Sequence, residues 1–140
     1  MGHVYVSAIF QGQKGRRKLD RLLVDTGATY TILPPPLADE IGVFSTPYKI
    51  QLTLADMSKK EASIGLAEVE VEGRREPVEI AIVDNGVPVL GVQALEVLGF
   101  EVNPLTKKLE GVRESGGLAL LCACNKRKLH TEADGSIPIR

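Results

Sequence analysis

Residues 22–29 read Leu-Leu-Val-Asp-Thr-Gly-Ala-Thr, an apolar run that ends in an aspartate. A carboxylate at the edge of a core is costly unless it is paired or used. Thr26 can hydrogen-bond to nearby backbone, Gly27 permits a tight backbone path, and Ala28 leaves space beside the carboxylate. The run therefore favours an Asp25 carboxylate that is presented to a substrate. The tripeptide alone would also suit an ordinary turn capped by an aspartate.

A second motif lies late in the chain. Residues 87–91 read Val-Pro-Val-Leu-Gly, residues 92–99 have the pattern of a short helix, and residues 100–103 follow as Phe-Glu-Val-Asn. Together with Asp25-Thr26-Gly27-Ala28, this arrangement resembles the aspartic proteases, and specifically their retroviral-type (retropepsin-like) branch. The resemblance covers roughly residues 4–112.

The resemblance implies an all-β fold, a closed acid-protease β-barrel with one or two short helices that is active as a two-fold homodimer. The protease domain would span residues 1–112. Residues 113–140 would form a C-terminal extension, with an extra strand at 118–124 and then a flexible tail.

The pattern of apolar residues agrees with an all-β chain. A proline run at 34–36 stops one strand and begins a short helix at 37–41, which Gly42 ends. The prolines would also suit a motif for proline-recognition domains. Alternation and β-prone runs predict strands at 4–10, 18–24, 29–33, 50–54, 62–71 and 78–83.

Aspartic protease chemistry needs two adjacent carboxylates that share a proton and hold one water, which gives a bell-shaped, usually acidic pH profile. Asp84-Asn85-Gly86 is the only candidate for a second motif in the same chain, and the Val87-Pro88 that follows does not fit. The resemblance therefore implies that each subunit supplies one Asp25. It also implies that Thr26 bonds across to the partner's backbone and that Gly27 accepts the substrate backbone.

The matching position for the hairpin that covers the substrate, called the flap, is residues 55–63. Its Lys59-Lys60-Glu61 departs from the glycine-rich flap tip of the viral enzymes, and an ordinary charged hairpin is the alternative. The predicted flap residues are Ala55, Asp56, Met57 and Ser58. The predicted walls of the substrate pocket, some of which would also suit the core, are Leu23, Ala28, Ile32, Ile82, Val89 and Leu90.

Composition limits the function classes. With 140 residues, 44% apolar and 25% charged residues and a net charge of −1, the chain suits one globular domain. Neither nucleic acid nor a membrane is an expected partner, because there is no basic excess, no apolar run long enough to span a bilayer and few aromatic residues. The N-terminus does not read as a signal peptide, and a cytoplasmic location is the expectation.

No metal or cofactor is expected. Cys122, Cys124 and His130 match no common zinc spacing, and Lys126-Arg127-Lys128 suits a solvated end better than a nucleic-acid contact. Only three residues precede the first strand, so an interlocking N-terminal strand is not available. The dimer interface is therefore expected at 105–112 or 118–124.

The sequence thus predicts an aspartic endopeptidase that cleaves extended, apolar peptide segments. A non-catalytic dimerisation or peptide-binding module on the same fold is the alternative. A third reading is a narrow self-processing or partner-processing enzyme that trims its own extension. The complete Asp-Thr-Gly-Ala favours catalysis, whereas the altered flap favours the binding module.

Overall fold

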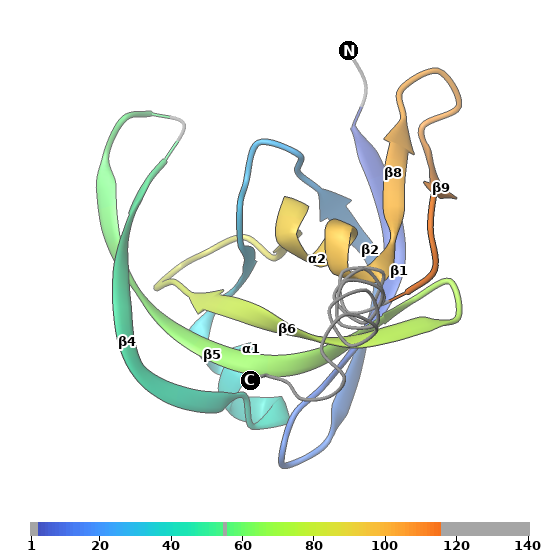
Figure 1. Cartoon of the computed structure of the whole chain (residues 1–140). Coiled ribbons are helices and arrows are strands. Elements are labelled where there is room, and N and C mark those ends of the chain that lie inside the picture. The colour runs from blue at the N-terminus through green and yellow to red at the C-terminus, as the bar shows by residue number, and fades with distance from the viewer. Residues whose placement is uncertain (1–2, 55, 116–140) are drawn as a thin grey trace, which may run out of the picture.

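The computed structural model describes residues 3–54 and 56–115. Within them the chain forms nine strands and two short helices (Figure 1), which confirms the predicted mostly-β fold. Ala55 and the predicted features beyond residue 115, including the strand at 118–124 and the two cysteines, lie outside the described residues. The elements in chain order are β1 Val4–Gln11, β2 Arg16–Val24, β3 Thr31–Leu33, α1 Pro35–Ile41, β4 Phe44–Thr53, β5 Lys59–Val71, β6 Arg74–Ile82, β7 Val89–Leu90, α2 Val92–Leu98, β8 Phe100–Asn103 and β9 Lys108–Gly111.

Seven strands form one sheet in the order β1-β2-β7-β3-β6-β5-β4, and β8 pairs with β9. β1 pairs with β2 along most of its length, and its end, Ile9 to Gln11, also pairs with Glu68 to Glu70 of β5. The short strands β3 and β7 lie side by side at the centre of the sheet order. This order places the end of β2 next to β7, which comes much later in the chain.

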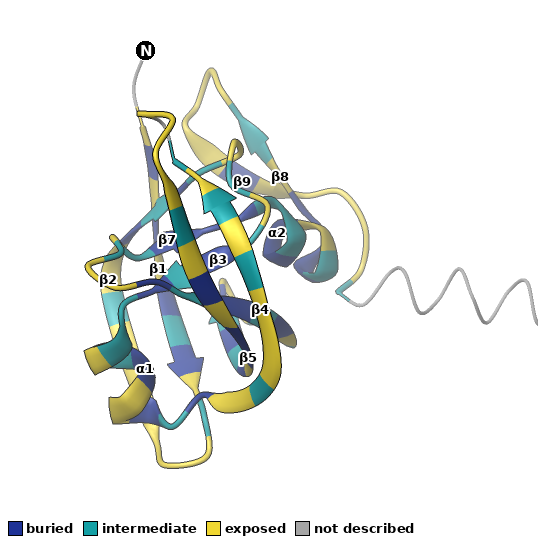
Figure 2. Cartoon of the chain, turned by 90° about the vertical axis from the view of Figure 1, so that its left-hand side faces the viewer, coloured by how far each residue is buried: buried dark blue, intermediate teal, exposed yellow. Residues whose placement is uncertain are grey.

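β4 begins earlier than the alternation predicts. It starts at Phe44, whereas the sequence pattern indicates a strand only at 50–54. Figure 2 shows that β4 is exposed or half-buried along its length. Its backbone pairs with β5 at Phe44 and Ser45 and again from Lys49 to Thr53, and the register shifts in between. Because no side chain in its first half is fully buried, no apolar period marks that half in the sequence.

The buried side chains form two clusters. The larger one is the core, and its fully buried members include Phe10, Leu22, Leu33, Ile80 and Leu98. The smaller cluster, which we call the hairpin cluster, lies between the β4–β5 hairpin and the strands β3 and β6. It consists of buried Ala62, Ile64, Ala81 and Val83 with half-buried Tyr30, Ile32, Ile50 and Leu52.

Arg74 fixes the end of α2. Its Nη1 donates hydrogen bonds to the carbonyl oxygens of Leu98 at 2.8 Å and Gly99 at 3.2 Å, and also to that of Arg113. Its guanidinium lies 4.7 Å from the centroid of the Phe100 ring. Carbonyls at a helix C-terminus lack partners within the helix and favour a cation. Arg74 therefore joins β6 to the segment that follows α2.

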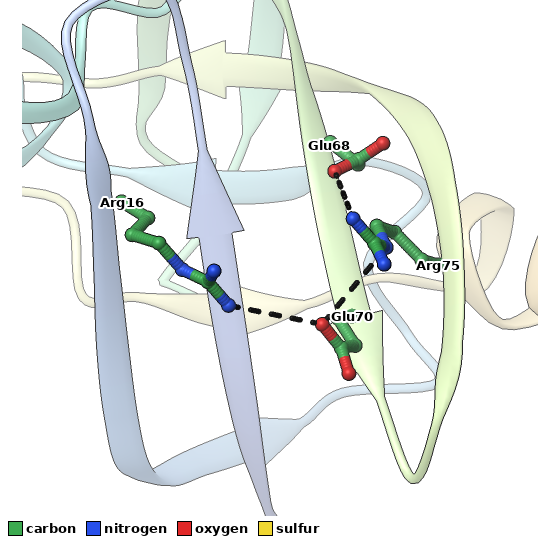
Figure 3. A network of polar contacts seen from close by, with 4 residues as sticks. All are labelled: Arg16, Glu68, Glu70 and Arg75. Atoms are coloured by element: carbon green, nitrogen blue, oxygen red, sulfur yellow. Dashed lines mark ion pairs between the residues drawn. The ribbon is translucent and has the colours of Figure 1, made fainter.

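An exposed ionic network crosses three strands. Arg16 of β2 and Arg75 of β6 both approach Glu70 of β5 at 4.0 Å, and Arg75 also approaches Glu68 at 3.8 Å (Figure 3). Pairs this long and this exposed contribute about 0–1 kcal/mol each. The fold is therefore held mainly by its apolar clusters and its strand pairing.

Neither helix in the described part of the chain has the length and apolarity needed to cross a bilayer.

Candidate active site

Asp25 follows β2 directly and opens the loop to β3. The Ala28 N–H donates to the Asp25 carbonyl at 3.1 Å, which closes a turn. The Gly27 N–H donates to Oδ1 of the Asp25 carboxylate at 2.9 Å. Asp25 is half-buried, whereas Thr26 and Gly27 are exposed. The loop therefore holds one carboxylate oxygen in a fixed position at the protein surface.

Gly27 lies within the tight turn that the Ala28 N–H closes on the Asp25 carbonyl. It is absent from the residues with positive φ, so its backbone is one that other residues adopt. A Cβ added there would lie 3.3 Å from Oδ1 of Asp25. The glycine thus keeps space open beside the carboxylate.

The β7–α2 segment anchors this loop. Val24 pairs with Leu90, and the next residue, Asp25, donates its N–H to the Leu90 carbonyl at 3.0 Å. One residue further, the Gly91 N–H donates to the buried hydroxyl of Thr31 at 3.1 Å. Both ends of the loop are therefore hydrogen-bonded to the second sequence motif, residues 87–91.

The loop also caps α2. This helix begins after Gly91 without a side-chain cap. Its first two N–H groups, those of Val92 and Gln93, donate to the carbonyls of Ala28 at 2.8 Å and Thr29 at 3.0 Å. These are donors that a helix leaves without partners. Because carbonyls of the Asp25 loop accept the first N–H groups of α2, the position of Asp25 depends on this helix.

The predicted flap is the hairpin between β4 and β5. Its tip lies at the same end of the molecule as the loop between β2 and β3 (Figure 1). The Leu54 N–H donates to the Ser58 carbonyl at 2.8 Å and the Met57 N–H to the Leu54 carbonyl at 2.9 Å. Met57 has a φ of 70° and is 77% exposed. The tip thus forms a tight turn without a glycine, and it presents an apolar side chain.

Asp56 stabilises this turn. Its Oδ1 accepts hydrogen bonds from the Ser58 hydroxyl and from the Ser58 N–H at 2.9 Å, and these bonds lower the pKa of Asp56, the hydroxyl having the larger effect. A lowered folded-state pKa means that the added stability is present above the ordinary pKa. It is lost as the pH falls through the lowered value.

We expect the Ser58 amide resonance to titrate with a midpoint below about 3.9, the ordinary aspartate value. An NMR titration measures this directly. Ser58→Ala removes the hydroxyl donor and should raise the midpoint, whereas Asp56→Asn should remove the titration. A wild-type midpoint at or above the ordinary value would contradict the turn as described.

The predicted pocket residues separate into two groups. Leu23, Ala28, Ile32 and Ile82 are half-buried, whereas Val89 is 6% exposed and Leu90 is fully buried. Ile32 packs in the hairpin cluster, but Ile82 and Leu90 pack with the core. Tyr30, Ile50 and Leu52, which were not among the predicted pocket residues, pack beside Ile32 in that cluster. The alternation at 50–54 predicted a strand that contains Ile50 and Leu52. It did not indicate which residues that face of the strand would pack against.

Other parts of the described chain do not add to this site. A cavity of about 420 Å³ is lined by residues of β1 and β9 and by Lys18, Glu70 and Glu72, and none of the predicted site residues lines it. Within the described residues, no three His, Cys, Asp or Glu side chains gather as metal ligands would.

The fold and the aspartate-bearing loop together define the class of aspartic proteases. A sequence model described as "Aspartyl protease" matches residues 6–102, and the chain belongs to this aspartyl protease family. The EIAV protease complexed with the inhibitor HBY-793 is similar in fold, with a TM-score of 0.58 and 16% sequence identity over 73% of this chain and 93% of that chain. A search of curated proteins gave no match.

Proposed function

We propose that the protein is an aspartic endopeptidase whose single active site is formed by the Asp25 carboxylates of two identical subunits. The observation that carries the proposal is the half-buried Asp25, whose next two residues are exposed. Its carboxylate accepts the Gly27 N–H, and its backbone N–H donates to the Leu90 carbonyl. One such carboxylate is half of the machinery that peptide hydrolysis requires.

The chemistry follows from the pair. Two carboxylates in contact share one proton and hold a water between them. The ionised carboxylate takes a proton from the water, whose oxygen bonds to the scissile carbonyl carbon. The protonated carboxyl hydrogen-bonds to the carbonyl oxygen as it gains charge. A proton then passes to the amide nitrogen, the C–N bond breaks, and the two product termini leave.

A two-fold axis beside Asp25 supplies the second carboxylate. At such an interface each contact occurs twice, so that one aspartate per chain gives a pair. Thr26 and Gly27 are exposed and available to meet a partner there. The pairing of β1 with both β2 and β5 supports the closed barrel expected from the sequence. We assign this barrel to residues 1–112 and treat 113–140 as an extension.

The substrate would lie extended between the Asp25 loop and the β4–β5 hairpin. Residues 56–58 of the flap would cover it, and the hairpin cluster would receive apolar side chains through Ile32, Ile50 and Leu52. Backbone hydrogen bonds to the hairpin would supply affinity and the apolar contacts would supply specificity.

Subunit mixing tests the shared site. A fixed amount of wild-type protein is exchanged with Asp25→Asn protein and assayed on a peptide pool. If both carboxylates are required and pairing is random, activity should fall to about one half at equal amounts and to about one tenth at a nine-fold excess.

Wild-type protein exchanged with additional wild-type protein is the control, and its activity should rise in proportion. Constant activity in the presence of excess variant would overturn the two-chain site. A protein that binds peptides but never cleaves them would instead be the binding module.

A further inference from the structure

Lys60 lies on the inner face of the β4–β5 hairpin. Residues 60, 62 and 64 of β5 share one face because side chains alternate along a strand. Ala62 and Ile64 on that face are buried in the hairpin cluster. Lys60 is half-buried, whereas its neighbours Lys59 and Glu61 are exposed on the opposite face. The inner, mostly apolar face of the hairpin therefore carries a cation near its tip.

The neighbours of Lys60 place its ammonium at the rim of the hairpin cluster. Lys60 is directly opposite Leu52 in the β4–β5 ladder, and paired residues lie on the same face. Its Nζ donates a hydrogen bond to the backbone carbonyl of Asp84 at 3.2 Å. Asp84 follows Val83, which is buried in the same cluster. The ammonium thus bridges the hairpin and the loop after β6.

The Lys60 ammonium has hydrogen-bond donors that the Asp84 carbonyl does not use. An ammonium has three donors, and the Asp84 carbonyl takes one of them. Among residues 3–54 and 56–115, no carboxylate forms an ion pair with Lys60. After the hydrogen bonds from Ser58, the Lys60 charge also helps to lower the pKa of Asp56 at the hairpin tip, but it is the smallest of the causes. A carboxylate from outside the described chain could therefore take a remaining donor.

We propose that Lys60 determines specificity by selecting an acidic side chain in the bound peptide, next to the apolar side chains that the hairpin cluster receives. The inference rests on the proposed function, because it places the peptide under this hairpin. A charge-assisted hydrogen bond from the Lys60 ammonium to a carboxylate is stronger than one between neutral groups, and salt screens it because the ammonium is open to solvent. Glutamate should therefore be preferred over its neutral isostere glutamine.

The test measures binding in the Asp25→Asn protein, so that peptides stay intact. The probes are labelled ten-residue peptides with a Val- and Leu-rich centre, in which each position in turn is Glu, Gln or Lys. We expect one or two positions at which Glu binds roughly ten-fold more tightly than Gln by fluorescence anisotropy. This preference should shrink as salt rises from about 50 mM to 0.5 M.

Matched variants assign the preference to this side chain. Lys60→Met keeps an apolar stem of similar length and should remove the preference, and Lys60→Glu should reverse it in favour of Lys peptides. Lys59→Glu makes the same charge change one residue away on the outer face and should leave the preference in place. Thermal unfolding of each variant shows whether the hairpin remains folded.

The inference is overturned if Glu and Gln peptides bind equally, if no peptide binds, or if Lys60→Met keeps the preference. Failure of the proposed function has a different signature. In that case the wild-type protein cleaves none of the peptides, whatever their affinity for the Asp25→Asn protein.

Discussion

Replacement of Asp25 by asparagine is expected to lower kcat/KM for peptide cleavage by at least about 10⁴-fold. An amide cannot take a proton from the water or share one with a partner carboxylate. The loop should survive, because the side-chain oxygen of the introduced asparagine can still accept the Gly27 N–H that Oδ1 of Asp25 now accepts at 2.9 Å. Chemistry and folding are therefore separable at this position.

The measurement is cleavage of a mixed peptide pool from about pH 3 to 7, read by mass spectrometry, with wild type and variant side by side. Asp39→Asn on the exposed side of α1 is the matched control and should retain wild-type activity. Equal melting temperatures would show that all three proteins are folded. Cleavage by the Asp25→Asn protein at the wild-type rate would exclude Asp25 as the acid–base group.

Gly91→Ala is expected to destabilise the fold by about 2–3 kcal/mol and to remove peptidase activity. A Cβ at this position would overlap the Tyr30 carbonyl oxygen and would lie 2.9 Å from that of Ala28. Both contacts are with backbone, so no side-chain rotation relieves them. The added methyl must push the Asp25 loop away from α2 and weaken the hydrogen bonds that hold it.

Chemical denaturation gives the loss of stability, and the peptide pool gives the loss of activity. Gly15→Ala is the matched control, because a Cβ there would meet no atom within 4 Å. It should change the free energy of unfolding by no more than about 0.5 kcal/mol. Wild-type stability and activity in Gly91→Ala would show that loop and helix are not packed as closely as described.

Local patterns predicted most of the elements. The alternation at 4–10 became β1, and Gly42 ends α1 with a φ of 75° as predicted. Gly99, which the pattern included in the second helix, ends α2 with a φ of 80°. Such signals are readable because they depend on residues a few positions apart. The first half of β4 was missed because its side chains are exposed or half-buried and carry no apolar period.

For the candidate site, the sequence identified the loop but not its surroundings. The sequence pattern identified both the Asp-Thr-Gly run and the second motif at 87–91. In the structure the two form the two sides of one hydrogen-bonded unit. The apolar residues around it were only partly assigned. Leu90 packs in the core, whereas Ile50, which the sequence marked only as part of a strand, lies in the hairpin cluster.

The sequence by itself determined the mostly-β character of the chain, its aspartyl protease motif and the presence of one Asp-Thr-Gly, because each is a property of neighbouring residues. Only the tertiary structure decided that Thr31 meets Gly91 and that Lys60 meets Asp84. It also decided which apolar side chains lie under the hairpin. These features depend on contacts between segments far apart in the chain, whose register is set by packing the whole sheet.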